Sequence, residues 1–218
     1  MSTFPARRFA AALFDMDGTI LSSIACAERV WADWARRHGV DVARFLPTIH
    51  GKRATETITA LGLPGIDVEA EAAAVTAAEM IDVGGIEPIP GAPALLAALP
   101  PARWAVVTSA PRELALRRLA AAGLPAPPLM VAAEDVVVGK PSPEGFLKAA
   151  RLLGADIADC LVFEDAPAGI AAAEAAGATL AIVTATHAHP IETRHACFRD
   201  YEALALSVDA DGLAFSRR

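Results

Sequence analysis

The sequence has few cysteines and no cluster of basic residues, which are the features typical of disulfide-rich proteins and of nucleic-acid-binding proteins. Its three cysteines, Cys26, Cys160 and Cys197, are odd in number and show no Cys-x-x-Cys spacing, so we expect no disulfide framework. Lysine and arginine form no run, and the formal net charge is -7 at pH 7. This balance disfavours a nucleic-acid partner and an anionic membrane surface.

Long apolar stretches are also missing. No apolar run is long enough to cross a bilayer, and the one after Arg7 and Arg8 is too short for a secretory signal and ends in two aspartates. We therefore expect a protein of the cytoplasm without a membrane partner. We also expect a monomer. Hydrophobic residues make up 54% of the 218 residues, which is enough for one large domain or for a core with a small insertion.

A short acidic stretch follows the first apolar run. Residues 9–14 suit a buried strand, and Asp15 and Asp17 come where that strand ends. Because side chains alternate along an extended chain, the two aspartates share a face, and Gly18 allows the backbone to turn beside them. Such a pair can bind a hard cation or divide the roles of nucleophile and proton donor, although an isolated Asp-x-Asp is more often a turn or a helix cap.

The next segment predicts helices and no strand. Apolar residues at three- and four-residue spacings indicate a helix from Ser22 or Ser23 to Gly39, a short helix near residues 55–61, and a third that opens at Asp67. Trp31 and Trp34 lie on the apolar face of the first helix, and we interpret them as core residues. A proline-marked linker follows at residues 87–91. We therefore predict an inserted all-helical domain, residues 20–87, within a core domain formed by residues 1–19 and 88–218.

From residue 93 onward, short buried strands alternate with helices. The predicted strands are residues 104–108, 129–132, 160–163 and 180–183, and the helices between them open at Pro93, Pro111, Ser142-Pro143 and Pro167. Apolar strands that are separated by helices pair in parallel, with both faces of the sheet covered. The predicted fold class is therefore α/β, a doubly wound parallel sheet with an inserted helical block.

Polar residues follow several of these strands. In doubly wound sheets, ligands bind at the carboxyl ends of the strands. The groups that the sequence places there are Asp15 and Asp17, Thr108 and Ser109, Glu164 and Asp165, and Lys140 in the turn before a helix. Each one alone has a structural explanation, but four such groups at one edge predict a site.

This set of residues suits a phosphoryl group. Asp15, Asp17 and Asp165 supply the oxygen ligands that Mg²⁺ prefers. The groups that would balance the phosphoryl oxygens are the Thr108 hydroxyl, the backbone amides near Ser109 and the Lys140 ammonium. Once these charges are offset, Asp15 can attack phosphorus and form an aspartyl-phosphate, while Asp17 protonates the leaving oxygen and then activates water.

The order of these segments resembles that of a known family. Residues 15–19, 107–109, 139–143 and 163–169 are similar, in this order, to the four signature motifs of the haloacid dehalogenase-like phosphatases, and the resemblance covers nearly the whole chain. It implies a Rossmann-like core with a helical cap, and Mg²⁺ as the cofactor. It also implies a nucleophile, Asp15; an acid/base, Asp17; phosphoryl ligands, Thr108, Ser109 and Lys140; and metal ligands, Asp15, Asp17, Glu164 and Asp165.

Two stretches, residues 49–52 and 164–169, are similar to the subgroup of small sugar- and polyol-phosphate phosphatases. The implied substrate is a small phosphate ester, and we expect the cap to select it through His50, Gly51, Lys52 and Arg53. The β-phosphoglucomutases share the metal motif, so transfer between two hydroxyls of one sugar stays open. A phospho-accepting receiver module is the non-enzyme alternative, which is disfavoured because its motifs follow a different order.

The histidines towards the C-terminus raise the question of a second metal site. His187 and His189, followed by His195 and Cys197, are residue types that bind zinc. No second close ligand pair with zinc-like spacing accompanies them. We therefore predict a polar surface loop here.

Overall fold

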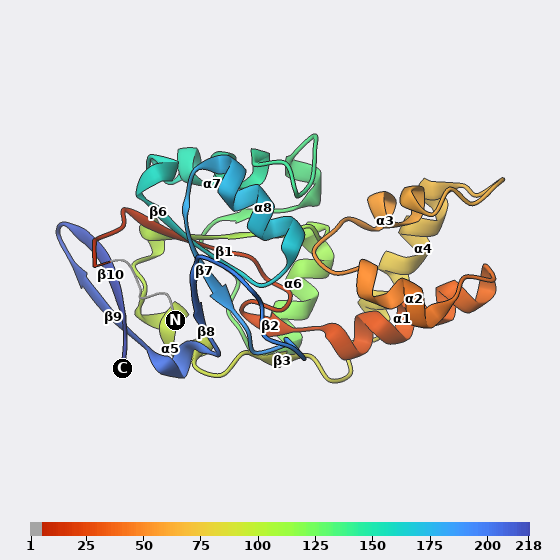
Figure 1. The fold of residues 1–218 in the computed structure, drawn as a ribbon, viewed down its shortest axis with the longest axis horizontal. Helices are drawn as coiled ribbons and strands as arrows, with labels where there is room; N and C mark the ends of the chain where they lie inside the picture. Colours follow the sequence, from red (N-terminus) through yellow and green to blue (C-terminus); the bar gives the residue numbers. More distant parts are fainter. Residues whose placement is uncertain (1–5) are drawn as a thin grey trace.

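A six-stranded parallel sheet forms the centre of the molecule (Figure 1). Its strand order is β5-β4-β1-β6-β7-β8. The computed structural model describes residues 6–218, so the first five residues of the predicted core segment lie outside it. The strands are β1 (Ala11–Phe14), β4 (Trp104–Val107), β5 (Met130–Val131), β6 (Cys160–Glu164), β7 (Thr179–Val183) and β8 (Ala196–Phe198). Because β1 is central and the chain winds away from it in both directions, the predicted doubly wound α/β sheet is confirmed.

Helices cover both faces of this sheet. Helices α7 (Glu144–Leu152) and α8 (Pro167–Ala176) pack on one face, and α5 (Ala92–Ala98) and α6 (Arg112–Ala121) pack on the other. The alternation along β1 explains this arrangement, because Leu13 packs in the apolar cluster with α7 and α8, and Phe14 packs in the cluster with α5 and α6. Burial of apolar side chains on both faces is the main favourable contribution to the stability of this core.

The C-terminal strands differ from the sequence prediction. β8 contains Cys197, so the predicted polar surface loop ends in a strand at the sheet edge. β9 (Leu204–Asp209) and β10 (Gly212–Arg217) form an antiparallel hairpin, and its Phe215 packs 5.2 Å from the ring of Phe163. A strand of three residues is too short to show a periodicity, which is why β8 was missed.

Helices α1 to α4 form a separate group at one end of the molecule (Figure 1). We refer to residues 24–81 as the helical unit, which contains α1 (Ile24–Arg37), α2 (Val42–Phe45), α3 (Ala54–Ala60) and α4 (Val68–Ile81). It has an apolar cluster of its own, in which Trp31 and Trp34 pack with a distance of 5.7 Å between ring centroids. The two tryptophans are therefore core residues, as predicted.

The connections to the helical unit also contain a short antiparallel ribbon. β2 (Leu21–Ser22) pairs with β3 (Glu87–Pro88), so the entering and the leaving chain run side by side. At the start of α4, the Asp67 side chain accepts a hydrogen bond from the amide of Ala70 at 3.1 Å, as expected of a helix cap. Among the residues that the structure describes, no helix combines the length and the apolarity needed to cross a membrane.

Candidate active site

The carboxyl ends of the central strands bring charged residues into contact. Asp15 follows β1, Glu164 ends β6, and Lys140 reaches both from the turn before α7. The Lys140 Nζ donates to Asp15 Oδ1 at 2.5 Å, to Glu164 Oε1 at 2.7 Å and to the carbonyl of Val107 at 3.1 Å. All three charged side chains are buried, so the ion pairs lie in a low-dielectric environment.

Asp165 completes a group of three buried carboxylates. One oxygen atom each of Asp15, Glu164 and Asp165 lies within 4.8 Å of the others. Thr19 Oγ1 donates to Asp165 Oδ1 at 3.1 Å. Gly18 has a φ of +89°, and a Cβ at this position would lie 2.0 Å from Asp165 Oδ2. The turn therefore needs glycine both for its backbone angle and for the space that Asp165 occupies.

Burial dominates the electrostatics of this group. Desolvation, and then the charge of Glu164, raises the pKa of Asp15 from its ordinary value of 3.8 to about 7, although Lys140 lowers it. The same two causes raise the pKa of Asp165. Burial lowers the pKa of Lys140, but the charges of Asp15 and Glu164 outweigh this effect and raise it overall. Three carboxylates that face one ammonium leave an excess of negative charge, which a divalent cation would offset.

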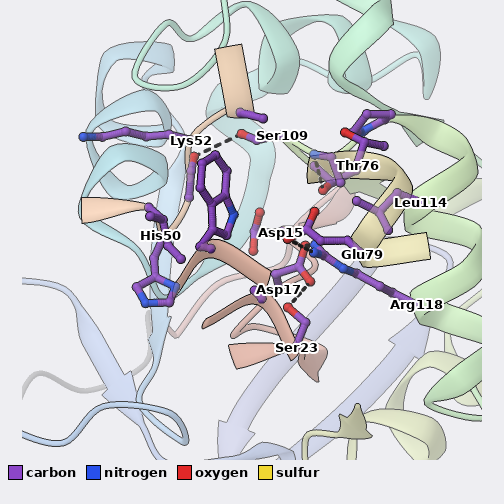
Figure 2. A pocket seen from close by; sticks show the side chains of 18 residues that line it. Asp15, Asp17, Ser23, His50, Lys52, Thr76, Glu79, Ser109, Leu114 and Arg118 are labelled. Carbon is purple, nitrogen blue, oxygen red and sulfur yellow. Dashed lines mark hydrogen bonds and ion pairs between the residues drawn. The ribbon is translucent and has the colours of Figure 1, made fainter. Parts of the chain in front are cut away.

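Asp17 has different partners from Asp15. Ser23 Oγ donates to Asp17 Oδ1 at 2.5 Å, and Arg118 Nη1 donates to Asp17 Oδ2 at 3.0 Å. The second nitrogen of the same guanidinium, Nη2, pairs with Glu79 Oε1 at 3.0 Å (Figure 2). Asp17 is thus connected through Arg118 to a carboxylate of α4 in the helical unit.

The sequence analysis did not identify Ser23, Glu79 or Arg118 as members of this site. A signal was present for two of them. Arg118 follows Leu114 by four residues on the buried face of α6, and Glu79 follows Val75 by four on the buried face of α4. A charged residue at an apolar position of a helix is a pattern that favours a buried partner.

Thr108 and Ser109 lie after β4, beside the aspartates. Thr108 is buried, and its Oγ1 accepts a hydrogen bond from the amide of Ala110 at 3.1 Å. Ser109 Oγ donates to the carbonyl of Gly51 at 3.0 Å, which connects the core to the segment between α2 and α3. Both residues line a cavity of about 90 Å³, together with Asp15 and Asp17. We call this the aspartate cavity.

Three of the four predicted specificity residues line the aspartate cavity: His50, Gly51 and Lys52. His50 Nε2 lies 3.6 Å from Glu28 Oε1. Lys52 is exposed, and its side chain extends away from the aspartates in Figure 2. Gly51 has a φ of +76°, and a Cβ there would approach the Cβ of Ala166 to 2.8 Å. Its backbone therefore packs closely against the loop that follows Asp165.

Arg53 contacts the core instead of the aspartate cavity. Its guanidinium donates to the carbonyls of Ala133 at 2.8 Å, Val136 at 2.9 Å and Val137 at 3.2 Å. These three carbonyls belong to the loop after β5. Arg53 thus holds the start of α3 against that loop.

The histidines near the C-terminus also have partners. His187 Nε2 lies 2.9 Å from the backbone carbonyl of Asp165, and His195 Nε2 lies 2.7 Å from Glu174 Oε1. The first contact connects the segment after β7 to the acidic loop of the site. The second connects the segment before β8 to α8.

Comparison with known proteins identifies the family. The family model described as "Hydrolase: haloacid dehalogenase-like hydrolase" matches residues 9–177. The chain is 43% identical over 177 residues to hexitol phosphatase A of Escherichia coli, covering 79% of this chain and 82% of that protein. It is 37% identical over 186 residues to validoxylamine A 7'-phosphate phosphatase of Streptomyces hygroscopicus, with coverages of 82% and 87%.

Solved structures agree with this result. The crystal structure of a hydrolase from Pseudomonas syringae is similar with a TM-score of 0.78 at 27% identity, covering 89% of this chain and 94% of that chain. The protein therefore belongs to the haloacid dehalogenase-like hydrolases, and the resemblance inferred from the motif order is confirmed. Membership of this enzyme family removes the receiver module as an alternative.

Proposed function

We propose that the protein is a Mg²⁺-dependent phosphatase that hydrolyses monoesters of small sugars or polyols through a phospho-Asp15 intermediate. The observation that carries this proposal is the contact of Asp15 with Lys140, among the carboxylates of Glu164 and Asp165, beside the cavity that Asp17 lines. Relatives such as hexitol phosphatase A and a glycerol-1-phosphate phosphohydrolase of Saccharomyces cerevisiae support the substrate class.

In the first step, an Asp15 oxygen attacks the phosphorus atom. The bond between phosphorus and the ester oxygen breaks, and Asp17 gives a proton to the departing alcohol oxygen. The Lys140 ammonium, which contacts Asp15 Oδ1, offsets negative charge as the phosphoryl group approaches the carboxylate. The Thr108 hydroxyl and the backbone at Ser109 bind the phosphoryl oxygens.

In the second step, water attacks the phosphorus of phospho-Asp15 while Asp17 accepts a proton from the water. The bond between phosphorus and the Asp15 oxygen breaks, and inorganic phosphate leaves. Hydrogen bonds from Ser23 and Arg118 reach the two oxygens of Asp17 separately, so they fix the direction of the carboxylate that moves these protons.

Asp15, Glu164 and Asp165 are the residues that would hold Mg²⁺. They fit this ion because they offer only oxygen atoms, lie within 4.8 Å of one another, and carry more negative charge than Lys140 offsets. When bound, the ion would draw charge from the phosphoryl oxygens and so favour attack by a carboxylate. A direct contribution of Asp17 to the metal stays a prediction.

We also propose that residues 20–87 act as a cap over a core formed by residues 1–19 and 88–218. The hydrogen bond from Ser109 to Gly51 supports this arrangement. His50, Gly51 and Lys52 line the aspartate cavity and are proposed to contact the leaving group. Arg53 is assigned to docking of the cap, because its contacts are with core carbonyls. We further propose a cytoplasmic monomer without a nucleic-acid partner, in keeping with the net charge of -7.

Release of inorganic phosphate tests the proposed function. A panel of hexitol, hexose and glycerol phosphates is incubated with the protein, in Mg²⁺ and in excess chelator. We expect release only with Mg²⁺, and a fall in kcat of several orders of magnitude for Asp15→Asn, because the uncatalysed reaction is extremely slow. Asp211→Asn, at an exposed position in the C-terminal hairpin, is the matched control and should retain the wild-type rate. Near-normal turnover by Asp15→Asn in chelator would contradict the proposal.

A hexose 1-phosphate separates hydrolysis from mutase chemistry. The phosphatase should convert it to free hexose and an equal amount of inorganic phosphate. Formation of hexose 6-phosphate with negligible inorganic phosphate would replace the proposal with a β-phosphoglucomutase-type reaction. The two products are distinguished by phosphorus nuclear magnetic resonance on one sample.

A further inference from the structure

Arg118 is the centre of a buried charge cluster that the mechanism above uses only in part. It lies on α6 of the core and is 6% exposed. One of its terminal nitrogens pairs with Asp17 and the other with Glu79, each at 3.0 Å (Figure 2). Asp17 has a role in proton transfer, whereas no step requires Glu79, which is 7% exposed on α4.

A purely structural role explains this cluster poorly. Burying a salt bridge removes both ions from water, and an apolar pair of similar size often stabilises a protein as well or better. Ala72 and Val75 precede Glu79 on the same buried face of α4, where apolar residues are the rule. Desolvation also raises the pKa of Glu79, against the opposing effect of Arg118. A stable core at this position therefore does not require the cluster.

The cluster also has unused hydrogen-bonding capacity. Arg118 Nε is buried and has no partner in the part of the chain that the structure describes. The Glu79 carboxylate accepts hydrogen bonds from the side chains of Arg118 and Trp31. A carboxylate has about four acceptor positions, so it can accept further hydrogen bonds. Both side chains line the aspartate cavity. A ligand in this cavity would therefore contact the buried Glu79 carboxylate, an acceptor, next to the Arg118 guanidinium, a donor.

The position of the cluster identifies the part of the substrate that it can contact. The phosphorus atom has to lie against Asp15, and the ester oxygen has to lie against Asp17. Glu79 is separated from Asp17 by one guanidinium group, so it lies beside the carbon atoms that follow the ester oxygen. In a sugar or polyol phosphate these carbon atoms carry hydroxyls, which donate to carboxylates.

We propose that Glu79, held in place by Arg118, forms a subsite that recognises the hydroxyls of the leaving alcohol next to the ester oxygen. The proposal deepens the proposed function and rests on it. The acceptor that the subsite offers to the leaving group is the carboxylate of Glu79. The subsite therefore takes uncharged, hydroxylated leaving groups, and it disfavours leaving groups that carry a carboxylate, because two carboxylates would then lie side by side.

Three esters provide the test. Glycerol 1-phosphate and propyl phosphate have the same carbon chain and differ in two hydroxyls, whereas 2-phosphoglycolate is a shorter ester that carries a carboxylate and no hydroxyl. We expect Glu79→Ala and Glu79→Gln to lower kcat/KM for glycerol 1-phosphate by about tenfold or more, the effect of a lost hydrogen bond to a charged group. The loss on propyl phosphate should stay below about threefold, and Glu79→Gln should improve activity on 2-phosphoglycolate.

Matched variants separate recognition from folding. Glu69→Gln removes an exposed carboxylate from the same helix and should leave the ratio between glycerol 1-phosphate and propyl phosphate unchanged. Arg118→Met should lower this ratio, and Arg118→Lys should recover part of it, because an ammonium can still pair with Glu79. If Glu79→Ala does not fold, the isosteric Glu79→Gln carries the test. Equal losses on glycerol 1-phosphate and propyl phosphate would overturn the proposal.

A binding measurement distinguishes failure of this proposal from failure of the proposed function. If the wild-type protein hydrolyses no phosphate ester, the phosphatase assignment is wrong. Calorimetry on Asp15→Asn then compares the affinities of glycerol 1-phosphate and propyl phosphate, with and without Glu79→Gln. Tighter binding of glycerol 1-phosphate that disappears with Glu79→Gln supports the subsite, and equal affinities in Asp15→Asn overturn it.

Discussion

Asp15 and Asp17 are two residues apart, yet their carboxylates have different surroundings. Asp15 is buried against Lys140, whereas Asp17 receives hydrogen bonds from Ser23 and Arg118. Burial, followed by the charge of Glu164, raises the pKa of Asp15. This difference suits a division of work in which Asp15 reacts with phosphorus and Asp17 moves protons.

Lys140 is expected to be essential for stability as well as for activity. Lys140→Met leaves Asp15 and Glu164 without their common cation, and loss of one partner from a buried ion pair destabilises a protein by about 3 to 5 kcal/mol. Urea denaturation at pH 8 measures this change. Lys52→Met, at an exposed position, is the control and should alter the midpoint little. Equal midpoints for the two variants would show that the ion pair contributes nothing.

Gly18 is expected to be specifically required by Asp165. Gly18→Ala would place a Cβ 2.0 Å from Asp165 Oδ2, so the carboxylate has to move. Gly62→Ala is a matched control, because Gly62 also has a positive φ, +59°, but nothing within 4 Å of the added Cβ. Both variants should lose about 1 kcal/mol from backbone strain. Only Gly18→Ala should raise the Mg²⁺ concentration needed for half-maximal activity, and a similar rise in both would contradict this explanation.

At the scale of elements, the segment between α2 and α3 makes two kinds of contact with the core. Gly51 accepts a hydrogen bond from Ser109 beside the aspartate cavity, and Arg53 donates to carbonyls of the loop after β5. On the other side of the cavity, Glu79 of α4 pairs with Arg118 of α6. Polar contacts thus connect the helical unit to the core on both sides of the cavity, and such contacts can break and form again if the helical unit moves as the proposed cap.

Loss of the Arg53 contacts is expected to loosen the helical unit from the core. Arg53→Ala removes three hydrogen bonds to backbone carbonyls, so amides of α3 should exchange hydrogen faster and KM should rise. Arg44→Ala, an exposed arginine of the same helical unit, is the control for removal of positive charge. Hydrogen exchange followed by mass spectrometry measures the first effect. Unchanged exchange in α3 would contradict the docking role of Arg53.

At the scale of the whole molecule, the acidic group couples stability to pH and to metal. The pKa of Asp15 is 3.8 in ordinary surroundings and about 7 in the folded protein. As the pH rises through this window, the unfolded chain loses the proton first and the folded protein retains it. The folded state thus binds more protons, so this group makes the free energy of unfolding fall as pH increases.

The metal-free protein is therefore expected to melt at a lower temperature at pH 8 than at pH 5.5. Mg²⁺ should reverse this loss, mainly at pH 8, because it binds the ionised carboxylates of the folded protein. Asp15→Asn should reduce the pH dependence and melt higher than the wild type at pH 8 without metal. Asp211→Asn serves as the control. Differential scanning fluorimetry provides the measurement, and a melting temperature that rises with pH in chelator would contradict the expectation.

Much of the fold and of the site could be predicted from local patterns. The alternation of short apolar strands with helices indicates a parallel sheet, and such a sheet places residues that follow its strands at one edge. Asp15, Lys140, Glu164 and Asp165 meet there, as this rule predicts. Each of these residues ends or directly follows a strand, or lies in a turn before a helix, and such positions can be recognised from a few neighbouring residues.

The sequence by itself determined the alternating elements, the order of the motifs and the gathering of polar groups at one sheet edge. Only the tertiary structure decided that Glu79 and Arg118 meet Asp17, and that β8 and the β9–β10 hairpin complete the sheet edge and the core. The periodicity of α4 and α6 shows which face of each helix is buried. It does not show which helix lies opposite, because that choice depends on how two distant faces pack together.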